Sequence, residues 1–357
     1  MTTRTRSFFL LSVCFVLLLA CNFRRASAPA PVSIPAEPAP TRQSAPPPAT
    51  KMPTVAPEML PTVAPQTSYG SLAREHLEVL SEEIGSRLPG SPEEAEAAAY
   101  VEAAFEAYGY EVAVQPFSFV TEDEEELESV NVIAVKRGVS TEELIVGAHY
   151  DSSDEAEGVD DNASGVAVLL EVAELLQDAE TPYTVRLIAF GAEEADLDGS
   201  RYYAGQMDDA EIENTVGMIN LDSLAAGDVA YVYGDAGPGT LRDWIMEQAE
   251  ETGFDLEART AEELDEPDGT PCECADYGPF QEIGVPFAYF EATNWDLGEQ
   301  DGMTQVDPEL GEEGVIRHTE YDTLAYIDTA FPERIDDHFD LFVTLLYDTL
   351  TQFEAQE

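Results

Sequence analysis

The chain has 357 residues, 44% of them apolar, so it is long enough and apolar enough to bury the core of one large domain. Its 73 Asp and Glu residues outnumber its 16 Lys and Arg residues, which gives a formal net charge of −57. That charge excludes binding to nucleic acid or to anionic membranes through a basic surface. Two interpretations of the acidity remain: attraction of basic peptides, or a strongly hydrated surface suited to high salt, which we favour.

The N-terminus carries the features of a targeting segment. Arg4 and Arg6 precede a mostly apolar run of 13 residues, 8–20. This run is too short to span a bilayer and is typical of a secretory signal peptide. It ends in LLAC at Cys21, which resembles a bacterial lipobox, so we predict cleavage before Cys21 and a lipid on this cysteine. The alternative is an ordinary signal peptide that is cut near residues 26–28.

The next segment is rich in proline and alanine. Twelve of the 23 prolines fall within residues 29–65, and no periodic apolar face appears there. Such a composition predicts a disordered, extended tether and not a domain. We therefore predict a signal peptide at 1–20, a tether at 21–67 and one folded domain at 68–357. The domain is expected outside the cytoplasm, bound to a membrane only through the lipid on Cys21, or else secreted.

The first clear element of the folded part is a helix at 91–109. Ser91 is suited to cap its N-terminus, Pro92 suits the first turn, and Glu94 would complete a capping box. Gly109 marks its end.

Apolar strands and helices alternate through the rest of the chain. Strands are predicted at 111–120, 130–138, 143–151, 183–192, 216–222, 229–234 and 285–292. Helices are predicted at 165–177, 199–207, 239–253, 275–284 and 331–353. This alternation predicts an α/β fold, a single domain with a central, mostly parallel mixed sheet flanked by helices. In such sheets ligands bind at the carboxyl ends of the strands.

Reactive side chains follow three of these strands. The first strand ends in His149 and Asp151, the second is followed by Glu193 and Glu194, and the third ends in Asp222. Two adjacent carboxylates beside a buried strand would repel each other strongly unless a cation lay next to them. A mixture of imidazole and carboxylate groups is what one or two zinc-like ions require, so we predict a metal site here.

Two further segments add to the predicted site. Asp160 and Asp161 lie in a loop rich in Gly, Asp and Asn between the first two of those strands, and His318 lies near the C-terminus. Taken singly, each aspartate is most simply a solvated surface group, and a histidine after a strand is most simply a core residue. The chain has only 4 histidines, however, so two at site positions are informative. We expect the other two, His76 and His338, to be structural or surface residues.

Five segments together resemble the motifs of the co-catalytic di-zinc aminopeptidases, family twenty-eight of the metallopeptidases. In chain order they read GAHYDS, DDNASG, FGAEE with its following GS, NLD and HTEYDT. The resemblance spans residues 70–350 and implies the zinc aminopeptidase (phosphorylase/hydrolase-like) fold and a zinc-dependent exopeptidase acting on the N-termini of peptides or proteins. Three more segments, INLDSLAAGD, FEATNWDLGEQDG and IDTAFPERID, resemble a secreted bacterial member that removes N-terminal arginine. They imply a preference for basic residues.

The resemblance also implies metal ligands at matching positions. His149, Asp161 and Asp222 would hold one zinc ion. Asp161 would bridge to a second zinc ion, held also by Glu194 and His318. The sequence does not distinguish zinc from cobalt or manganese as the native metal.

Catalytic roles follow from the same resemblance. Glu193 would act as the general base towards the attacking water, and Asp151 would orient the imidazole of His149. The peptide bond between Asp161 and Asn162 would be cis.

Some positions depart from the family pattern. Known members carry an oxyanion-donating tyrosine beside the last histidine or between two cysteines, whereas here Arg317 precedes that histidine and the CEC segment has no tyrosine. Tyr277 remains as a candidate donor. Glu291 is a candidate to face a basic substrate side chain, and Trp295 is either a pocket residue or a packing residue. Cys272 and Cys274 form a tight disulfide, an intermolecular bridge or a pair of free thiols.

Two alternatives to the aminopeptidase come from other functional classes. One is a catalytically inactive binding ectodomain of the same fold. The other is a transferase similar to glutaminyl cyclase, which uses this sheet with a single zinc ion. Retention of every ligand position argues against the first, and a second bound ion would exclude the cyclase.

Overall fold

The computed structural model describes residues 69–121, 124–153, 157–264 and 274–355. The predicted signal peptide and tether, and also Cys272, lie outside these residues. The described residues all belong to Ala49–Glu357, one of the two units into which the chain divides. Within the described ranges, no helix combines the length and the apolar composition that crossing a membrane requires.

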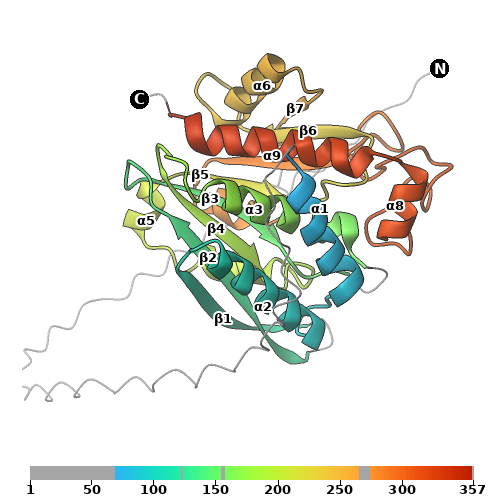
Figure 1. Cartoon of the computed structure of the whole chain (residues 1–357), viewed down its shortest axis with the longest axis horizontal. Helices are drawn as coiled ribbons and strands as arrows, with labels where there is room; N and C mark the ends of the chain where they lie inside the picture. Colours follow the sequence, from blue (N-terminus) through green and yellow to red (C-terminus); the bar gives the residue numbers. More distant parts are fainter. Residues whose placement is uncertain (1–68, 122–123, 154–156, 265–273, 356–357) are drawn as a thin grey trace, which may run out of the picture. The chain divides into compact units, whose positions relative to one another are not determined.

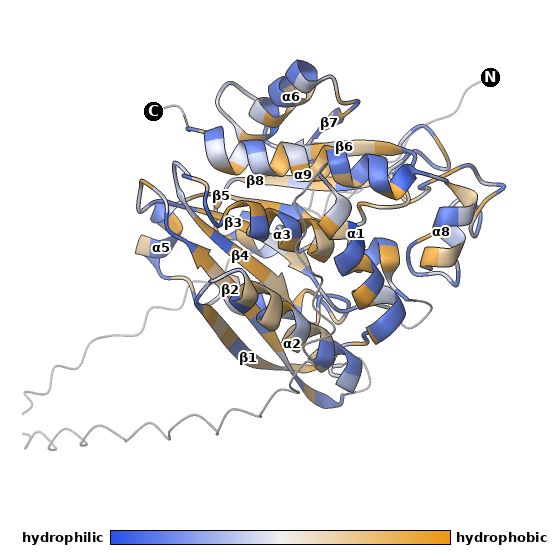
Figure 2. Cartoon of the chain, viewed as in Figure 1, coloured by the Kyte–Doolittle hydropathy of each residue, from blue (hydrophilic) through white to orange (hydrophobic). Residues whose placement is uncertain are grey.

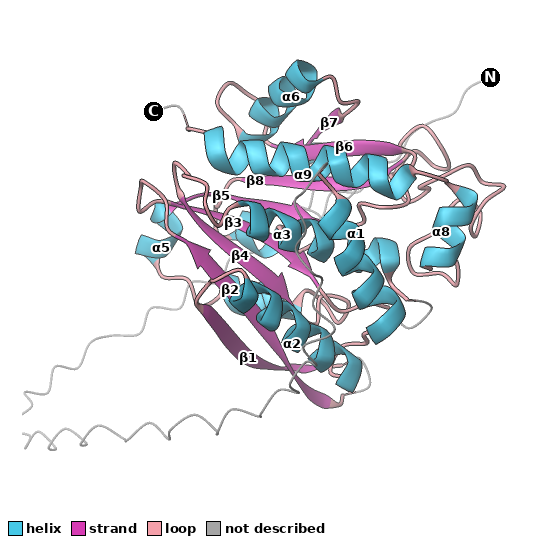
Figure 3. Ribbon diagram, viewed as in Figure 1, coloured by secondary structure: helices cyan, strands magenta, loops and turns pink. Residues whose placement is uncertain are grey.

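One mixed sheet organises the described residues (Figures 1 and 3). In spatial order its strands are β1 (Val112–Val120), β2 (Glu126–Lys136), β4 (Thr184–Phe190), β3 (Glu143–His149), β5 (Thr215–Leu221), β8 (Phe287–Thr293), β6 (Val229–Gly234) and β7 (Glu257–Thr260). The central strands β4, β3, β5 and β8 run parallel to one another. Antiparallel pairings of β1 with β2, β2 with β4 and β6 with β8 extend the sheet on both sides. The predicted α/β domain with a mixed central sheet is confirmed.

Helices cover both faces of the sheet. The face seen in Figure 1 carries α1 (Ser71–Glu78), α2 (Pro92–Ala107), α3 (Ser164–Leu175), α6 (Leu241–Thr252) and α9 (Arg334–Gln352). The opposite face carries α4 (Asp198–Ala204) and α7 (Gly278–Glu282). Two further short helices are α5 (Asp209–Asn214) and α8 (Leu324–Ala330). A π-helical turn, Val79–Ile84, continues α1, and another, Val159–Ala163, leads into α3.

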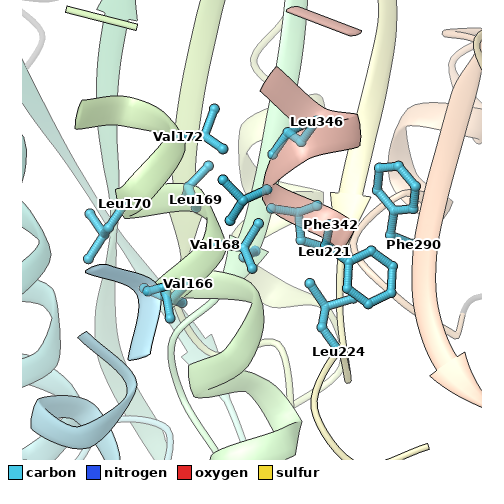
Figure 4. Packing of buried hydrophobic residues seen from close by; sticks show 14 of the residues in the cluster. Val166, Val168, Leu169, Leu170, Val172, Leu221, Leu224, Phe290, Phe342 and Leu346 are labelled. Atoms are coloured by element: carbon cyan, nitrogen blue, oxygen red, sulfur yellow. The ribbon is translucent and has the colours of Figure 1, made fainter. Parts of the chain in front are cut away.

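The pleat of the strands creates a core on each face. Leu144 and Val146 of β3 belong to the layer under α3, whereas Ile145 between them belongs to the layer under α4 and α7. Figure 2 shows the central strands as the most apolar part of the fold. On the α3 side, the valines and leucines of this helix pack near Phe342 and Leu346 of α9 (Figure 4). Full burial of each such side chain stabilises the fold by about 1.5–3 kcal/mol.

Helix α2 begins where the sequence predicts, but one part of its cap differs. Ser91 Oγ accepts the N–H of Glu94 at 3.0 Å, as expected of a capping serine. The carboxylate of Glu94 instead accepts the N–H of Gly90 at 2.6 Å and of Ala192 at 3.1 Å. The predicted capping box is therefore wrong, because buried Glu94 holds the loop that follows β4.

Among the described strands and α-helices, three short ones were not predicted: β7, α5 and α8. Each has seven residues or fewer, and α5 contains only one large apolar residue in DAEIEN. Such segments show no periodic pattern that the sequence alone would reveal.

Candidate metal and active site

Neighbouring parallel strands deliver the candidate ligands to one edge of the sheet. β3 ends at His149, β5 ends one residue before Asp222, and β4 ends three residues before Glu193. Because these strands run parallel, their carboxyl ends share this edge, as predicted. Asp161 comes from the π-helical turn before α3, and His318 comes from the segment between β8 and α8.

Two groups of three side chains meet at Asp161. His149 Nε2 lies 3.1 Å from Asp161 Oδ1 and 3.6 Å from Asp222 Oδ1. His318 Nε2 lies 3.0 Å from Asp161 Oδ2 and 3.1 Å from Glu194 Oε2. Within each group the potential ligand atoms lie within 4.8 Å of one another. The two oxygens of Asp161 therefore face different histidines, in the arrangement expected of a bridging carboxylate.

The residues of both groups fit a divalent metal ion. Each group offers one imidazole nitrogen and two carboxylates, a donor set that suits zinc. In addition, Glu194 Oε1 is buried and has no hydrogen-bond partner among the described residues. A buried carboxylate oxygen without a partner is costly, and an adjacent cation would remove that cost.

The electrostatics of the cluster point to the same need for positive charge. Burial raises the pKa of Glu193 well above its usual value, although the charge of His149 opposes this. Hydrogen bonds to Asp161 and Glu194 raise the pKa of His318 to about 11. Burial favours a higher pKa for Asp161, but its hydrogen bonds to the two histidines outweigh this and lower it. The directions of these shifts show that the carboxylates favour a positive charge beside them, which bound metal ions would supply.

Asp151 supports the adjacent Glu193 and Glu194 through their main chain. Its two oxygens accept the N–H groups of Glu193 at 3.1 Å and of Glu194 at 3.0 Å. It also lies 3.6 Å from His149 Nδ1, which has no hydrogen bond among the described residues. Orientation of this imidazole by Asp151 stays a prediction, while its contact with the glutamate loop is a further finding.

A second buried carboxylate, missed by sequence reasoning, supports the aspartate loop in the same way. Asp322 accepts the N–H groups of Asp160 at 2.7 Å and of Asp161 at 3.2 Å. Asp160 itself turns away from the ligand groups and accepts the N–H groups of Ala225 and Ala226 at 2.7 and 2.8 Å. The one signal that could have revealed Asp322 is its place in the HTEYDT segment. The bond between Asp161 and Asn162 is cis, as the resemblance predicts.

Arg87 is a further supporting residue that the sequence did not reveal. Its guanidinium is fully buried and donates to five backbone carbonyls at 2.7–3.1 Å, those of Leu80, Gly85, Tyr150, Glu157 and Gly158. Burial lowers the pKa of Arg87 to about 10. Through these hydrogen bonds, Arg87 connects the segment that follows His149 with the segment that precedes Asp160. Its guanidinium also places a positive charge near the candidate ligands Asp161 and Glu194.

A cavity of about 940 Å³ lies over the ligand groups. The candidate site residues that line it are His149, Asp161, Glu193, Asp222 and His318. Further from the ligands its lining includes Tyr289, Glu291, Trp295, Met303 and Arg317. The size suits part of a peptide, and Glu193 lines the cavity together with His149 and His318.

The interactions of Glu291 differ from those expected for a residue that binds a basic substrate. Its Oε1 atom lies 2.6 Å from Arg317 Nη1, and its Oε2 atom accepts a hydrogen bond from Tyr233 at 2.6 Å. Glu291 is therefore already paired within the chain. Trp295 lines the cavity and also donates from Nε1 to the Tyr233 hydroxyl at 2.7 Å, so it combines both predicted roles.

Tyr277 does not occupy the position that an oxyanion donor needs. Its side chain is 1% exposed and stacks on Phe287, with ring centroids 4.2 Å apart. It is not among the described residues that line the cavity, so its position does not support the predicted role. Next to it, Cys274 is disulfide-bonded, which excludes a free thiol at this position.

The two remaining histidines are structural, as predicted. His76 is fully buried, and its ring nitrogens lie 2.6 Å from the Tyr100 hydroxyl and 2.7 Å from the Tyr108 hydroxyl. Burial lowers the pKa of His76 to about 3. His338 Nδ1 lies 2.9 Å from the carbonyl of Leu224, and His338 belongs to neither ligand group.

Comparison with known proteins agrees with this geometry. The model of peptidase family M28 matches residues 131–343, more than half of the chain. The chain belongs to peptidase family M28. The sequence-based prediction of a metallo-aminopeptidase of this family is confirmed.

Curated relatives in the M28 family include the alkaline phosphatase isozyme conversion protein of Escherichia coli, 29% identical over 78% of this chain and 89% of the relative. Aminopeptidase YwaD of Bacillus subtilis is 29% identical over 62% of this chain but only 45% of its own length. A probable lipoprotein aminopeptidase, LpqL of Mycobacterium tuberculosis, is 40% identical over 28% of this chain and 21% of its own length.

Solved structures share the M28 fold. A zinc aminopeptidase of Bacillus subtilis, BSAP, superposes with a TM-score of 0.63 at 19% identity, over 81% of this chain and 97% of that chain. The glutaminyl cyclase of Porphyromonas gingivalis superposes with a TM-score of 0.60 at 20% identity, over 79% of this chain and 98% of that chain. At these identities the superpositions show the fold and do not distinguish the two activities.

Proposed function

We propose that this M28 protein is a two-zinc aminopeptidase that removes N-terminal residues from peptides or proteins. One observation carries the proposal: Asp161 presents one oxygen to each of two histidines, and each histidine belongs to a separate ligand group. His149, Asp161 and Asp222 would hold one ion. Asp161, Glu194 and His318 would hold the other. When bound, zinc would acidify water and polarise the peptide carbonyl.

Glu193 is the proposed general base. Its carboxylate lies 3.9 Å from His149 Nε2 and lines the cavity, but it belongs to neither ligand group. It would accept a proton from the attacking water and deliver it to the leaving amine. Burial raises the pKa of Glu193, which suits a group that must hold a proton between these two steps. Asp151 would position this glutamate through its main-chain N–H.

The same proposal includes a preference for basic N-terminal residues. The residues that support this preference differ from Glu291, the candidate that the sequence suggested. Glu291 is neutralised by Arg317, so it does not support this preference. Glu263 also lines the cavity but is paired with Arg259. Two other exposed carboxylates in the lining, those of Asp301 and Glu312, do support the preference. Their negative charge would favour lysine or arginine side chains near the cavity opening, an effect that salt should weaken.

We also propose that the enzyme acts outside the cytoplasm and is tethered through a lipid on Cys21. The signal-like run and the LLAC segment support this proposal. The resemblance to the mycobacterial relative named as a probable lipoprotein aminopeptidase agrees with it.

A glutaminyl-cyclase-like transferase is the second candidate, because such a cyclase shares the fold. The two ligand groups favour the peptidase, since the cyclase alternative requires only one zinc ion. The two functions are separated by their products: a peptidase releases a free amino acid, whereas a cyclase converts N-terminal glutamine to pyroglutamate.

The direct test uses purified protein and a panel of aminoacyl 4-nitroanilides together with a glutamine-initiated peptide. We expect release of nitroaniline, fastest with Arg or Lys, complete loss after chelation and recovery with zinc. Formation of pyroglutamate without release of any amino acid would replace the peptidase by the cyclase. Bound zinc with neither reaction would favour the inactive binding domain.

A further inference from the structure

Arg317 is the one residue with a permanent positive charge among the described residues that line the cavity. Its side chain is 16% exposed, so part of the guanidinium reaches the cavity while the rest is enclosed. It directly precedes His318 in the chain and lines the same cavity as Asp161 and Glu193. A peptide bond placed for attack beside Glu193 would therefore lie in a cavity that also presents this guanidinium.

A chain of side-chain hydrogen bonds orients the guanidinium. Trp295 Nε1 donates to the hydroxyl of Tyr233 at 2.7 Å, and this hydroxyl donates to Glu291 Oε2 at 2.6 Å. Glu291 Oε1 accepts from Arg317 Nη1 at 2.6 Å. Both oxygens of Glu291 are therefore used, and the buried carboxylate holds Arg317 in one orientation. The other terminal nitrogen, Nη2, makes only long contacts to the described chain, at 3.4 and 3.6 Å.

The main chain of Arg317 is fixed to the metal-ligand loops as well. Gln305 Oε1 accepts the N–H groups of Ile316 and Arg317 at 3.0 and 2.8 Å. Gln305 Nε2 donates to Asp160 Oδ2 at 2.6 Å, next to the shared ligand Asp161. A donor held this rigidly next to a ligand pair is preorganised for charge that develops during a reaction.

Aromatic hydroxyls offer fewer candidates for the same task. Tyr277 is buried behind the cavity wall. Tyr289 lines the cavity, and its ring stacks on Tyr233 with centroids 5.1 Å apart. Tyr289 is thus the alternative donor that an experiment must separate from Arg317.

We propose that Arg317 donates a hydrogen bond to the carbonyl oxygen of the scissile peptide bond, with Glu291 and Tyr233 as positioning residues. This rests on the proposed aminopeptidase function. When the water oxygen bonds to the carbonyl carbon, the π electron pair moves onto the carbonyl oxygen and Glu193 holds the released proton. When this pair re-forms the C=O bond, the C–N bond breaks and the amine leaves with the proton. Arg317 stabilises the oxygen while it carries the negative charge.

The test compares Arg317→Met, Arg317→Lys and Tyr289→Phe with the wild type, after metal analysis shows equal zinc content. On an arginyl 4-nitroanilide, Arg317→Met should lower kcat by about 100- to 1000-fold with KM changed less than threefold. Arg317→Lys should retain more activity, because it keeps the charge but not the planar donor group. Tyr289→Phe should change kcat by less than about threefold.

The positioning residues have a separate readout. Glu291→Gln should lower kcat by a larger factor than it raises KM. Without the carboxylate, the guanidinium of Arg317 is less well oriented, and this weakens its contact with the transition state more than substrate binding. In a Glu193→Gln background, calorimetry should show that Arg317→Met binds an arginine-initiated peptide within about threefold of the parent, as expected of an interaction made mainly in the transition state.

Three results would overturn the proposal. The first is a zinc-loaded Arg317→Met protein with a wild-type kcat. The second is a loss of dipeptide hydrolysis alone, since that would mean recognition of a C-terminal carboxylate that the anilide lacks. The third is a loss of kcat in Tyr289→Phe but not in Arg317→Met. Failure of the proposed function itself would look different, because the zinc-loaded wild type would then hydrolyse none of these substrates.

Discussion

Two hollows at opposite ends of the sheet show what separates a reactive site from an acidic surface. The hollow at the amino ends of β3, β4 and β5 measures about 1030 Å³ and includes the glutamates Glu142, Glu180, Glu213 and Glu354 in its lining. These side chains are exposed. The cavity at the carboxyl ends is of similar size, about 940 Å³, but two of the carboxylates that line it, Asp161 and Asp222, are buried and face histidines. Volume does not distinguish the two hollows and both have an acidic lining, whereas buried carboxylates and an opposing imidazole occur only in the lining of the second.

The difference has an electrostatic cause. An exposed carboxylate is solvated and needs no partner, so the glutamates of the amino-end hollow cost little. A buried carboxylate must have a cation or several N–H donors. At the carboxyl edge Asp151, Asp160 and Asp322 each accept two backbone N–H groups, while the ligand carboxylates face the histidines.

The largest expected effect separates a largely buried glutamate, Glu193, from an exposed one. Glu193→Gln should lower kcat by about 10³-fold, because the amide cannot accept the proton of the attacking water. The matched variant Glu180→Gln, in the amino-end hollow, should leave kcat within twofold of the wild type. Steady-state assays at equal zinc content check this prediction, and an active Glu193→Gln protein would remove the general base from the account.

The next effect concerns the carboxylates behind the ligands. Asp322→Asn should weaken zinc binding by about 10- to 100-fold, since one amide oxygen cannot replace two carboxylate oxygens that hold the Asp160–Asp161 main chain. Asp328→Asn is the control, because Asp328 pairs with Arg74 and its side chain is 42% exposed. Competition with a chromophoric chelator measures both affinities. Equal affinities for the two variants would show that the support of this loop is dispensable.

A smaller effect should appear in the dependence of stability on pH. Burial lowers the pKa of His76 to about 3, so between pH 3 and 6.5 the unfolded state binds more protons than the folded state. The stability due to neutral His76 is complete above pH 6.5 and falls as the pH decreases, by about 2 kcal/mol at pH 5. Urea unfolding should show that His76→Gln loses less stability than the wild type between pH 7.5 and 5. An identical loss in both proteins would refute the assignment.

The smallest effect is expected at the amino-end hollow itself. Glu142→Gln and Glu213→Gln should each change the free energy of unfolding by less than about 0.5 kcal/mol, because exposed carboxylates have no buried partner to lose. Urea titration at moderate salt measures this. A destabilisation above 2 kcal/mol would show that this hollow has a structural role like that of the buried edge.

The sequence indicated which candidate ligands would lie together, but not the residues that support them, and the reason is physical. The ligand candidates follow strands whose apolar runs and parallel arrangement can be read locally, so their common edge follows from the fold class. Asp322, Arg87 and Glu94 act on residues far away in the chain, through hydrogen bonds that leave no periodic pattern. The pairing of Glu291 with Arg317 could not be predicted for the same reason, because the two residues are 26 positions apart in the chain.

Metal stoichiometry tests the central claim most directly. Asp161 and Asp160 are neighbours, but only Asp161 faces the two histidines, whereas Asp160 accepts backbone N–H groups. Native mass spectrometry of the zinc-supplied protein should show two zinc ions per chain in the wild type and in Asp160→Asn, provided that variant remains folded. It should show one ion or none in Asp161→Asn. A wild-type protein that binds a single zinc ion, or an Asp161→Asn protein that retains two, would contradict the account.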